Sequence, residues 1–590
     1  MDFPPGLVYL SSRLPYVLVP PAVLYLACRA CESQVSGGLL TLLWVLCFPV
    51  YLLVLSKWTE HRDEREAEAM GAVMPPKLAH DWPLGLDIIW KGLKRFADSY
   101  PGDNFRPVIE EYGHIFNSRI LGENRIVTVE PEHIKMILAT NFNNFEKGGN
   151  FQNQVRSVLG TGVFNSDGEM WKFHRSMTRP FFTKDRISHF DIFDRHAEQV
   201  VKLMKARFEE GYAIDFQDLI ARFTLDSATE FLFGHDVHSL AAGLPYPESA
   251  KHKRNHSNHP ATAFVNAFSN AQARIAMRGR FGSAWPLIEF WADRAKKYLG
   301  PVNEFIEPIL QNAIERKKNS KVIEEVAGER EIREGETLLD HLVHYTEDQT
   351  ILRDEILNML VAGRDTTAGT MTSLVYMLSQ HPDVLTRLRE EILNKVGPSR
   401  RPSYEDLRDM KYLRAVINET LRLFPIVPAN VRSSIKGTIL PSKRADGRPY
   451  YIPAGTRIAY SVLLMHRRTD LWGHDALQFD PDRFIDERLH KYLTPNPFIF
   501  LPFNAGPRIC LGQQFAYNEI SFMTVRLLQH FSDIALAPDA QPESSKPPSS
   551  WANGPGRQPV EKIRPRQHLT LFAFEGLWLR MTEANDSGTA

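Results

Sequence analysis

Residues 503–512 read F-N-A-G-P-R-I-C-L-G and place a single cysteine, Cys510, between two glycines. Gly506 can adopt a backbone conformation that other residues resist, and Gly512 lets a bulky group approach the chain closely. A helical pattern follows from Gln513 to Phe531, so the Cys510 sulfur should lie near a helix N-terminus. The helix dipole and the free N–H groups at such a terminus lower the pKa of a thiol, which favours a thiolate that can bind a metal ion.

Cys510 is the only cysteine after residue 47. A lone cysteine is most often a small buried apolar residue, but the neighbours of Cys510 favour another interpretation. The spacing F-x-x-G-x-R-x-C-x-G resembles the haem-ligating signature of the cytochrome P450 family, and Phe503, Gly506, Arg508, Cys510 and Gly512 match its fixed positions. The resemblance implies that these residues bind haem b, with Cys510 as the iron ligand. Arg508 suits a haem propionate as a charge-assisted partner.

A second match is an acidic and a basic residue in the helical stretch from Leu413 to Phe424. Glu419 and Arg422 stand three residues apart, so their side chains share a helix face. Such a pair is weak evidence by itself, since surface ion pairs are common. In the cytochrome P450 family the equivalent pair is buried and is joined by an arginine of a P-x-R-F motif. This chain has P-D-R-F at 481–484, so the resemblance implies that Arg483 completes the network.

A third match lies in a long, nearly apolar helical stretch, Gln349–Gln380, which carries A-G-R-D-T-T at Ala362–Thr367. Gly363 destabilises a helix interior, and threonine hydroxyls compete for the preceding carbonyls, so we expect a local widening of the helix. An ordinary helix with polar surface residues is the alternative interpretation. The motif resembles the family's oxygen-activation motif. The resemblance implies a groove for O2 over the iron, with Asp365 and Thr366 as the acid–alcohol pair that relays protons.

Two further matches concern the haem propionates. W-K-F-H-R resembles the W-x-x-x-R element whose tryptophan and arginine contact a propionate in this family, here Trp171 and Arg175. Arg432 matches a third propionate contact. His174 and His466 are alternative iron ligands, but the residues around them do not resemble a haem site. The five motifs occur in the order expected of the family.

The pattern from about residue 74 onward predicts a mainly α-helical domain with small β-sheets, as in the cytochrome P450 fold. Apolar residues recur at helical spacing in four long stretches, Asp191–Gly211, Asp215–Gly234, Leu287–Lys318 and Gln349–Gln380. Short strands are predicted at Arg125–Val129, Thr456–Tyr460 and His568–Arg580.

An uncharged apolar stretch at residues 33–56 precedes this domain. About 20 apolar residues suffice to cross a bilayer as a helix. We therefore expect residues 1–73 to form an N-terminal transmembrane anchor with a span at about 37–56, and residues 74–590 to form the haem-thiolate domain. A buried core helix is the alternative, but the preceding chain offers little to bury it. Residues 15–28 form a second apolar segment that spans, re-enters or lies on the membrane.

Basic residues follow the predicted span, namely Lys57, Arg62 and Arg65, interleaved with acidic ones. A basic flank favours the cytoplasmic side of a membrane. Together with the resemblance to microsomal enzymes, this flank predicts an endoplasmic reticulum protein whose catalytic domain faces the cytosol.

Two stretches, 238–261 and 541–567, resemble surface insertions in the domain. The first contains K-H-K-R-N-H-S-N-H at 251–259, whose three histidines have no periodic scaffold to aim them at one ion, so a solvated loop is favoured over a metal site. The second is rich in Pro, Ser, Gly and charged residues, which is typical of a loop.

The amino-acid composition limits the kinds of molecule that the protein is expected to bind. Lys plus Arg and Asp plus Glu both total 70, and this balance gives no electrostatic reason to expect nucleic acid. Each catalytic cycle of a P450 monooxygenase needs two electrons, and the chain shows no G-x-G-x-x-G fingerprint for a nucleotide cofactor. We therefore expect a separate NADPH–cytochrome P450 reductase as partner, with Lys172 and Arg179 as candidate docking residues. Membrane lipid is the other expected partner.

The resemblance implies a substrate pocket that includes Ala362, Val427, Asn430, Val431 and Phe574, most of which are apolar. An apolar small molecule is therefore expected as substrate. The chain resembles fungal microsomal P450s that hydroxylate alkanes and fatty acids, whose relatives also oxidise alkylphenols and aromatic hydrocarbons. We favour hydroxylation at or near the end of long aliphatic chains. The alternatives are a thiolate-haem enzyme that rearranges peroxides without a reductase and a non-catalytic membrane haem-binding sensor.

Overall fold

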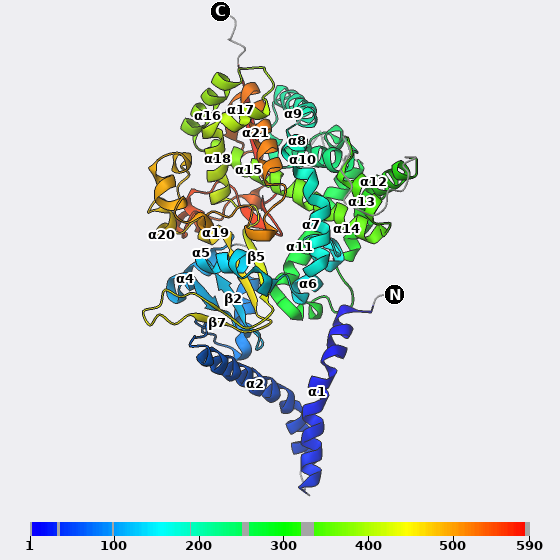
Figure 1. The fold of residues 1–590 in the computed structure, drawn as a ribbon, viewed down its shortest axis with the longest axis vertical. Helices are drawn as coiled ribbons and strands as arrows, with labels where there is room; N and C mark the ends of the chain where they lie inside the picture. Colours follow the sequence, from blue (N-terminus) through cyan, green and yellow to red (C-terminus); the bar gives the residue numbers. More distant parts are fainter. Residues whose placement is uncertain are drawn as a thin grey trace, which may run out of the picture.

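The computed structural model describes residues 3–31, 36–96, 99–188, 190–250, 259–319 and 335–584. Within these ranges the chain is mainly helical with small sheets, which confirms the predicted fold class. The helices gather in one half of the domain and most strands in the other, next to the two N-terminal helices (Figure 1).

The α-helices along the described chain are α1 Pro5–Ala30, α2 Gly37–Ala69, α3 Leu86–Phe96, α4 Arg106–Tyr112, α5 Pro131–Lys135, α6 Gly149–Leu159, α7 Gly168–Thr178, α8 Lys184–Ile187, α9 Asp191–Glu209, α10 Phe216–Phe233, α11 Pro260–Phe281, α12 Leu299–Asn319, α13 Leu338–Tyr345, α14 Gln349–Leu360, α15 Thr366–Leu378, α16 Pro382–Lys395, α17 Tyr404–Asp409, α18 Lys411–Leu423, α19 Val462–Met465, α20 Thr469–Trp472 and α21 Gln513–His530. The strands are β1 Ile115–Asn117, β2 Arg125–Thr128, β3 Phe145–Glu146, β4 Ile214–Asp215, β5 Ala429–Ser434, β6 Thr438–Leu440, β7 Tyr450–Ile452, β8 Arg457–Ser461, β9 Phe531–Leu536, β10 Pro565–Gln567, β11 Leu571–Ala573 and β12 Trp578–Glu583.

The largest sheet has the strand order β1-β2-β8-β5-β3. Strands β2 and β8 run parallel, and the other neighbours run antiparallel. Its strand β5 carries Asn430 and Val431 opposite Tyr460 and Ala459 of β8. A smaller sheet places β12 between β4 and β9. The predicted strands at 125–129 and 456–460 are confirmed as β2 and β8.

The packing of the core explains why the long helical stretch that includes α15 is nearly apolar. Most side chains of α15 and α21 are buried, because neighbouring helices surround both of them. The main hydrophobic cluster draws on α9, α10, α15, α16, α18 and α21. Such a close-packed core resists deformation. It therefore holds the start of α15 and the start of α21 at fixed positions.

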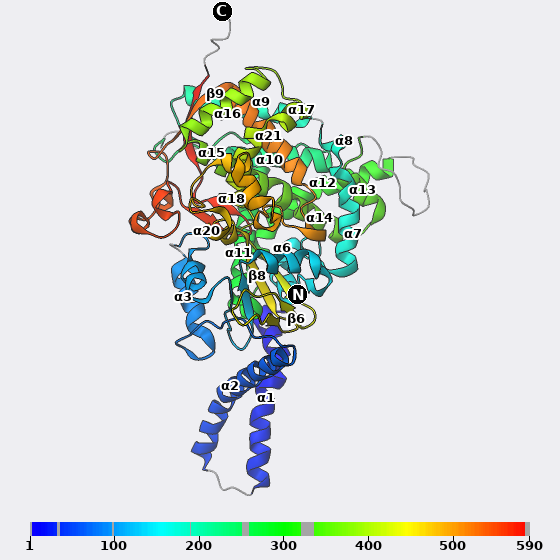
Figure 2. The same cartoon turned by 60° about the vertical axis from the view of Figure 1, so that its left-hand side comes forward.

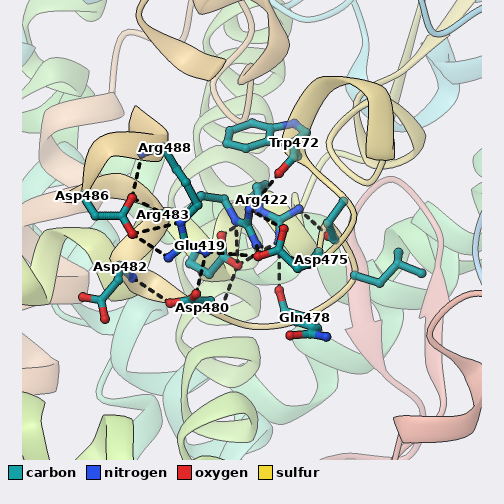
Figure 3. A network of polar contacts seen from close by, with 12 residues as sticks. Glu419, Arg422, Trp472, Asp475, Gln478, Asp480, Asp482, Arg483, Asp486 and Arg488 are labelled. Atoms are coloured by element: carbon teal, nitrogen blue, oxygen red, sulfur yellow. Dashed lines mark hydrogen bonds and ion pairs between the residues drawn. The ribbon is translucent and has the colours of Figure 1, made fainter. Parts of the chain in front are cut away.

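The predicted network of Glu419, Arg422 and Arg483 is assembled inside the domain, and each of these side chains has 0% exposure (Figure 3). Arg422 Nε and Nη2 donate to the two oxygens of Glu419 at 2.7 and 2.8 Å. Arg483 Nε lies 3.7 Å from Glu419 Oε1, and its Nη2 donates to Asp475 Oδ2 at 2.9 Å. The network ties α18 to the segment that precedes the cysteine loop.

The two N-terminal helices project together from the base of the domain (Figures 1 and 2). Both are long and apolar enough to cross a membrane, judged by length and composition alone. The expected span at 37–56 lies in α2. The second apolar segment, 15–28, lies within α1, which continues through Pro15, Pro20 and Pro21. Prolines of this kind are tolerated in membrane helices.

Both helices contact the domain, α1 near its first residues and α2 in its second half. The Gly6 N–H donates to the Phe290 carbonyl at 2.9 Å. Near the end of α2, Arg119 Nη2 donates to the Ser56 carbonyl at 2.9 Å, and the Tyr451 hydroxyl donates to Glu66 at 2.7 Å. The start of α1 and the end of α2 therefore lie on the same side of the helix pair.

Two of the predicted secondary-structure elements are wrong in extent. The helix predicted at Leu287–Lys318 begins only at Leu299, because Glu289 and Asp293 cap local turns by accepting from the Arg294 and Ala295 N–H groups. The strand predicted at His568–Arg580 is two strands, β11 and β12. They are separated by a turn in which Glu575 and Gly576 have positive φ values of 58° and 90°.

Part of the segment 541–567, expected as a surface insertion, packs on the domain. Trp551, Arg557 and Glu561 are buried. Glu561 accepts hydrogen bonds from the Tyr100 hydroxyl at 3.0 Å and from the Tyr376 hydroxyl at 2.6 Å. Arg557 Nε also donates to Glu561 at 2.9 Å, so these two charges pair inside the fold.

Much of the other expected insertion, 238–261, also packs on the domain. Ser239 and Leu240 are buried, and Arg222 Nη1 donates to the Ser239 carbonyl at 3.1 Å. The helix α11 begins at Pro260. Residues 251–258, with most of the histidine-rich stretch, lie outside the described residues.

Candidate active site

The cysteine loop is a tight structure just before α21. A short turn, Gly506–Arg508, precedes Cys510, whose N–H donates to the Phe503 carbonyl at 3.0 Å. Asn504 and Gly506 have positive φ values of 64° and 67°. A Cβ atom on Gly506 would lie 1.8 Å from the Leu138 carbonyl oxygen, so only glycine fits there.

We expect Gly506→Ala to impair the cysteine loop. Alanine at this positive φ adds about 1–2 kcal/mol of strain, and the clash with the Leu138 backbone forces the loop to move. Purified Gly506→Ala should therefore contain less haem per protein than the wild type and unfold at a lower temperature. Gly397→Ala is the control, because Gly397 has a φ of 86° but no atom within 4 Å of an added Cβ. Equal losses of haem in the two variants would contradict the assignment.

Cys510 is partly open to solvent and borders a cavity of about 630 Å³. The residues around this cavity are Arg175, Arg179, Pro180, Phe182, Thr183, Pro507, Ile509, Cys510 and Leu511. Neighbouring protein atoms reduce the solvation of the Cys510 thiolate and raise the pKa of the thiol, while the Gly512 N–H and the charge of Arg175 lower it. The N–H group at the helix terminus therefore acts in the predicted direction, but in the protein alone the loss of solvation outweighs it.

Buried cations close to the loop have too few partners within the protein. Arg432 is 1% exposed, and its Nη1 donates to the Val431 carbonyl. Among the described residues no carboxylate pairs with Arg432, and the Nε atoms of Arg432 and Arg508 have no hydrogen-bond partner. A buried guanidinium without an anion is costly. The residues present therefore fit an anionic group such as a haem propionate.

Lys147 belongs to the same cluster, and the sequence analysis missed it. Burial and the charges of Arg432 and Arg508 lower the pKa of Lys147 well below its usual value. Burial, followed by the charge of Arg432, lowers the pKa of Arg508 to about 10. Arg508 also donates to Asp167 Oδ1 at 2.7 Å. Lys147 follows β3 directly, and nothing in its local sequence indicates that it meets residues more than 280 positions away.

Trp171 and Arg175 of α7 pack against the cysteine loop. The Arg508 guanidinium lies 4.5 Å from the centre of the Trp171 ring. Arg175 Nη1 donates to the Ile509 carbonyl at 3.0 Å, next to Cys510. The structure thus brings Trp171, Arg175 and Arg508 together, with Arg175 closest to the cysteine.

The expected widening of the central helix is confirmed. A π-helical turn, Val361–Asp365, separates α14 from α15. The Thr366 hydroxyl donates to the Ala362 carbonyl at 2.5 Å. The Asp365 carboxylate has different partners: Arg364 Nη1 donates to Oδ1 at 2.5 Å and Gln272 Nε2 donates to Oδ2 at 2.7 Å. Sequence analysis did not identify Gln272, which lies 93 positions earlier in the chain.

The expected pocket residues lie in three parts of the chain. Ala362 is in the π-helical turn, and Val427, Asn430 and Val431 lie half-buried in or just before β5. Phe574 follows β11, and the Arg566 guanidinium lies 3.7 Å from the centre of its ring.

A buried contact links β11 to the chain before β5. The Leu571 N–H donates to the Ile426 carbonyl at 2.9 Å, and both side chains join Leu463 in a small apolar cluster. The Leu571 carbonyl also faces Gly369 of α15. Leu571 and Ile426, rather than Phe574, therefore connect β11 with the central helix.

Both histidines that were considered as iron ligands have other roles. The His466 Nε2 accepts from the Leu501 N–H at 2.8 Å, and burial lowers the pKa of His466 to about 3. His174 forms a buried pair with Glu355 of α14.

A cysteine that borders a cavity, a cluster of cations with few anionic partners and a widened helix are features that a haem-thiolate site would need. A scan against protein families matches residues 76–558 to the cytochrome P450 model. The chain belongs to the cytochrome P450 family and is a monooxygenase of that family.

Three similar fungal proteins extend over most of the chain. Cytochrome P450 monooxygenase g430 of Fusarium sp is 35% identical over 84% of this chain and 86% of its own length. Cytochrome P450 52-M1 of Starmerella bombicola is 35% identical over 86% of this chain and 94% of its own length. Cytochrome P450 52A1 of Candida tropicalis is 38% identical over 72% of this chain and 75% of its own length.

Proposed function

We propose that this monooxygenase hydroxylates long aliphatic chains, such as alkanes or fatty acids, at or near the terminal carbon. The observation that supports this proposal is the apolar character of the expected pocket residues before and within β5. Val427 and Val431 are half-buried there, and they follow Ile426, which joins Leu463 and Leu571 in a buried apolar cluster against Gly369 of α15. A hydrocarbon chain fits such a surface because its burial is favourable at about 0.8 kcal/mol per CH₂.

In this proposal the protein binds haem b through residues of three segments. Cys510 would hold the iron, and Arg432, Arg508 and Lys147 would hold the propionates. The bound haem supplies the activation of O2, which a thiolate ligand favours by pushing electron density onto the iron. The Trp171 ring, stacked on Arg508, keeps that guanidinium in place.

Asp365 and Thr366 would control proton delivery at the π-helical turn. The turn exposes the Ala362 carbonyl to the Thr366 hydroxyl instead of to an ordinary helical N–H group. The Asp365 side chain is 8% exposed, so protons reach the site through fixed groups rather than through bulk water. The protein thereby positions the reacting groups and limits the access of bulk water to them.

Electrons would come from NADPH through a separate reductase. Lys172 and Arg179 are both exposed, on α7 and just after it, and Arg179 borders the cavity that contains Cys510. A basic surface close to the iron ligand suits an acidic electron donor.

The N-terminal helices support an anchor of residues 1–73 in the endoplasmic reticulum membrane, with residues 74–590 facing the cytosol. The start of α1 and the end of α2 both contact the domain, so a helix pair that crosses the membrane twice returns the chain to the side where it began. Lys57, Arg62 and Arg65 then lie on the cytosolic side, as the charge bias of membrane proteins favours.

The test is an oxygenation assay with the purified full-length protein, a P450 reductase, NADPH and isotopically labelled O2. We expect dodecane or dodecanoate to gain one labelled hydroxyl group at or near the chain end. An alkylphenol serves as the comparison substrate. Exclusive oxidation of the alkylphenol would contradict the aliphatic assignment. Product formation from a hydroperoxide without NADPH would favour the peroxide-rearranging alternative, and haem binding without any product would favour the sensor.

A further inference from the structure

A glutamine far from the family motifs contacts the proposed proton-relay acid. Gln272 lies on α11 and has 0% exposure. Its Nε2 donates to Asp365 Oδ2 at 2.7 Å, while Arg364 Nη1 donates to Oδ1 of the same carboxylate at 2.5 Å. Both oxygens of Asp365 are therefore held, one by a neighbour in the same turn and the other by a separate helix.

The stability of the fold does not explain an amide at position 272. The Gln272 Oε1 atom is buried and accepts no hydrogen bond from the residues that the structure describes. A buried acceptor without a partner is destabilising, and native proteins have few of them. The neighbours of Gln272 on the same side of α11 are Phe268, Ala271 and Ile275, all buried, so an apolar side chain of similar length is compatible with this surface. The useful property of Gln272 is its N–H donor.

We propose that Gln272 is a positioning residue for Asp365, an inference that rests on the proposed role of Asp365 in proton delivery. Arg364 alone leaves the carboxylate free to rotate about its bond to Cβ. The second donor, fixed on α11, removes this freedom, because it holds the other carboxylate oxygen from a separate helix. Because α11 is a separate element, the orientation of Asp365 depends on how α11 packs against the central helix.

The decisive variant is Gln272→Met, which keeps the length of the side chain and removes the donor. We expect kcat for hydroxylation to fall about tenfold, because a hydrogen bond to a charged group is lost. Product formed per NADPH consumed should fall as well, and the solvent deuterium isotope effect on kcat should rise. The KM for substrate should stay at the wild-type value, since Gln272 bonds the acid and not the substrate.

The matched control is Asn270→Ala on the same helix. The Asn270 side chain is exposed and donates to the Asn266 carbonyl at 2.8 Å, so this variant should match the wild type in every readout. Unchanged kcat and product ratio in Gln272→Met would overturn the proposal. A raised KM with unchanged kcat would also overturn it, because Gln272 would then act on substrate binding.

A second measurement tests the contact without an activity assay. In a double-mutant cycle on the thermal unfolding of the holoenzyme, Gln272→Met and Asp365→Ala should be coupled, because each removes the same hydrogen bond. Asn270→Ala and Asp365→Ala should be additive. Additive behaviour of the Gln272 pair would overturn the contact. A wild type without oxygenated product would instead refute the proposed function, whatever the cycle shows.

Discussion

Cys510→Ala should fold and yet show no NADPH-dependent oxygenation. Cys510 is the only cysteine of the domain, and its side chain faces a cavity, so alanine removes the sulfur without creating a clash. His174 and His466, the histidines considered as substitutes, are bonded to Glu355 and to the Leu501 N–H. The expected result is therefore complete loss of product in the labelled-oxygen assay.

Cys47→Ala is the matched control for this substitution. Cys47 lies in α2, outside the haem-thiolate domain. Its replacement should leave product formation at the wild-type level. If Cys510→Ala retained activity, a different residue would have to bind the iron, and the assignment of the loop would be wrong.

Arg422→Met should cause the largest loss of stability among the substitutions considered. The Arg422 guanidinium bonds both oxygens of Glu419 and also the backbone carbonyls of His466, Ala476 and Gln478 (Figure 3). Its removal leaves the Glu419 charge in the interior, with the Asp480 N–H and the more distant Arg483 as partners. Breaking a buried pair in this way costs about 3–5 kcal/mol. That is a large share of the ~5–15 kcal/mol by which folded domains are usually stable.

Arg387→Met provides the comparison, since Arg387 also donates twice to one carboxylate, that of Asp482. This pair is exposed at 50% and 39%, so its loss should cost less than about 1 kcal/mol. Chemical unfolding of both variants, followed by circular dichroism, measures the difference. Equal losses of free energy would show that the buried network does not stabilise the fold as argued.

Features encoded by neighbouring residues were predictable from the sequence. Glu419 and Arg422 share a helix face because they are three residues apart. The π-helical turn at Val361–Asp365 follows from a glycine and threonines within one apolar helix. The helices α9, α10 and α21 were found from their periodicity for the same reason.

Features that depend on packing between distant segments were not predictable. Gln272 meets Asp365, and Glu561 meets Tyr100 and Tyr376, only after the helices have packed. The polar composition of 541–567 indicated a surface loop, and no sequence pattern shows that Arg557 and Glu561 pair inside the fold. The net direction of the Cys510 pKa shift was not predictable for a related reason: the helix terminus, which lowers this pKa, is visible in the sequence, whereas the loss of solvation that raises it is not.

The carbon monoxide difference spectrum of the reduced full-length protein tests the central claim most directly. A cysteine thiolate on the iron shifts the main absorption band of the carbon monoxide complex strongly to the red, compared with a histidine ligand. We predict this red-shifted band in the wild type and its absence in Cys510→Ala. A wild-type band like that of a histidine-ligated haem, or no haem spectrum at all, would contradict the assignment of Cys510 and of every site residue that depends on it.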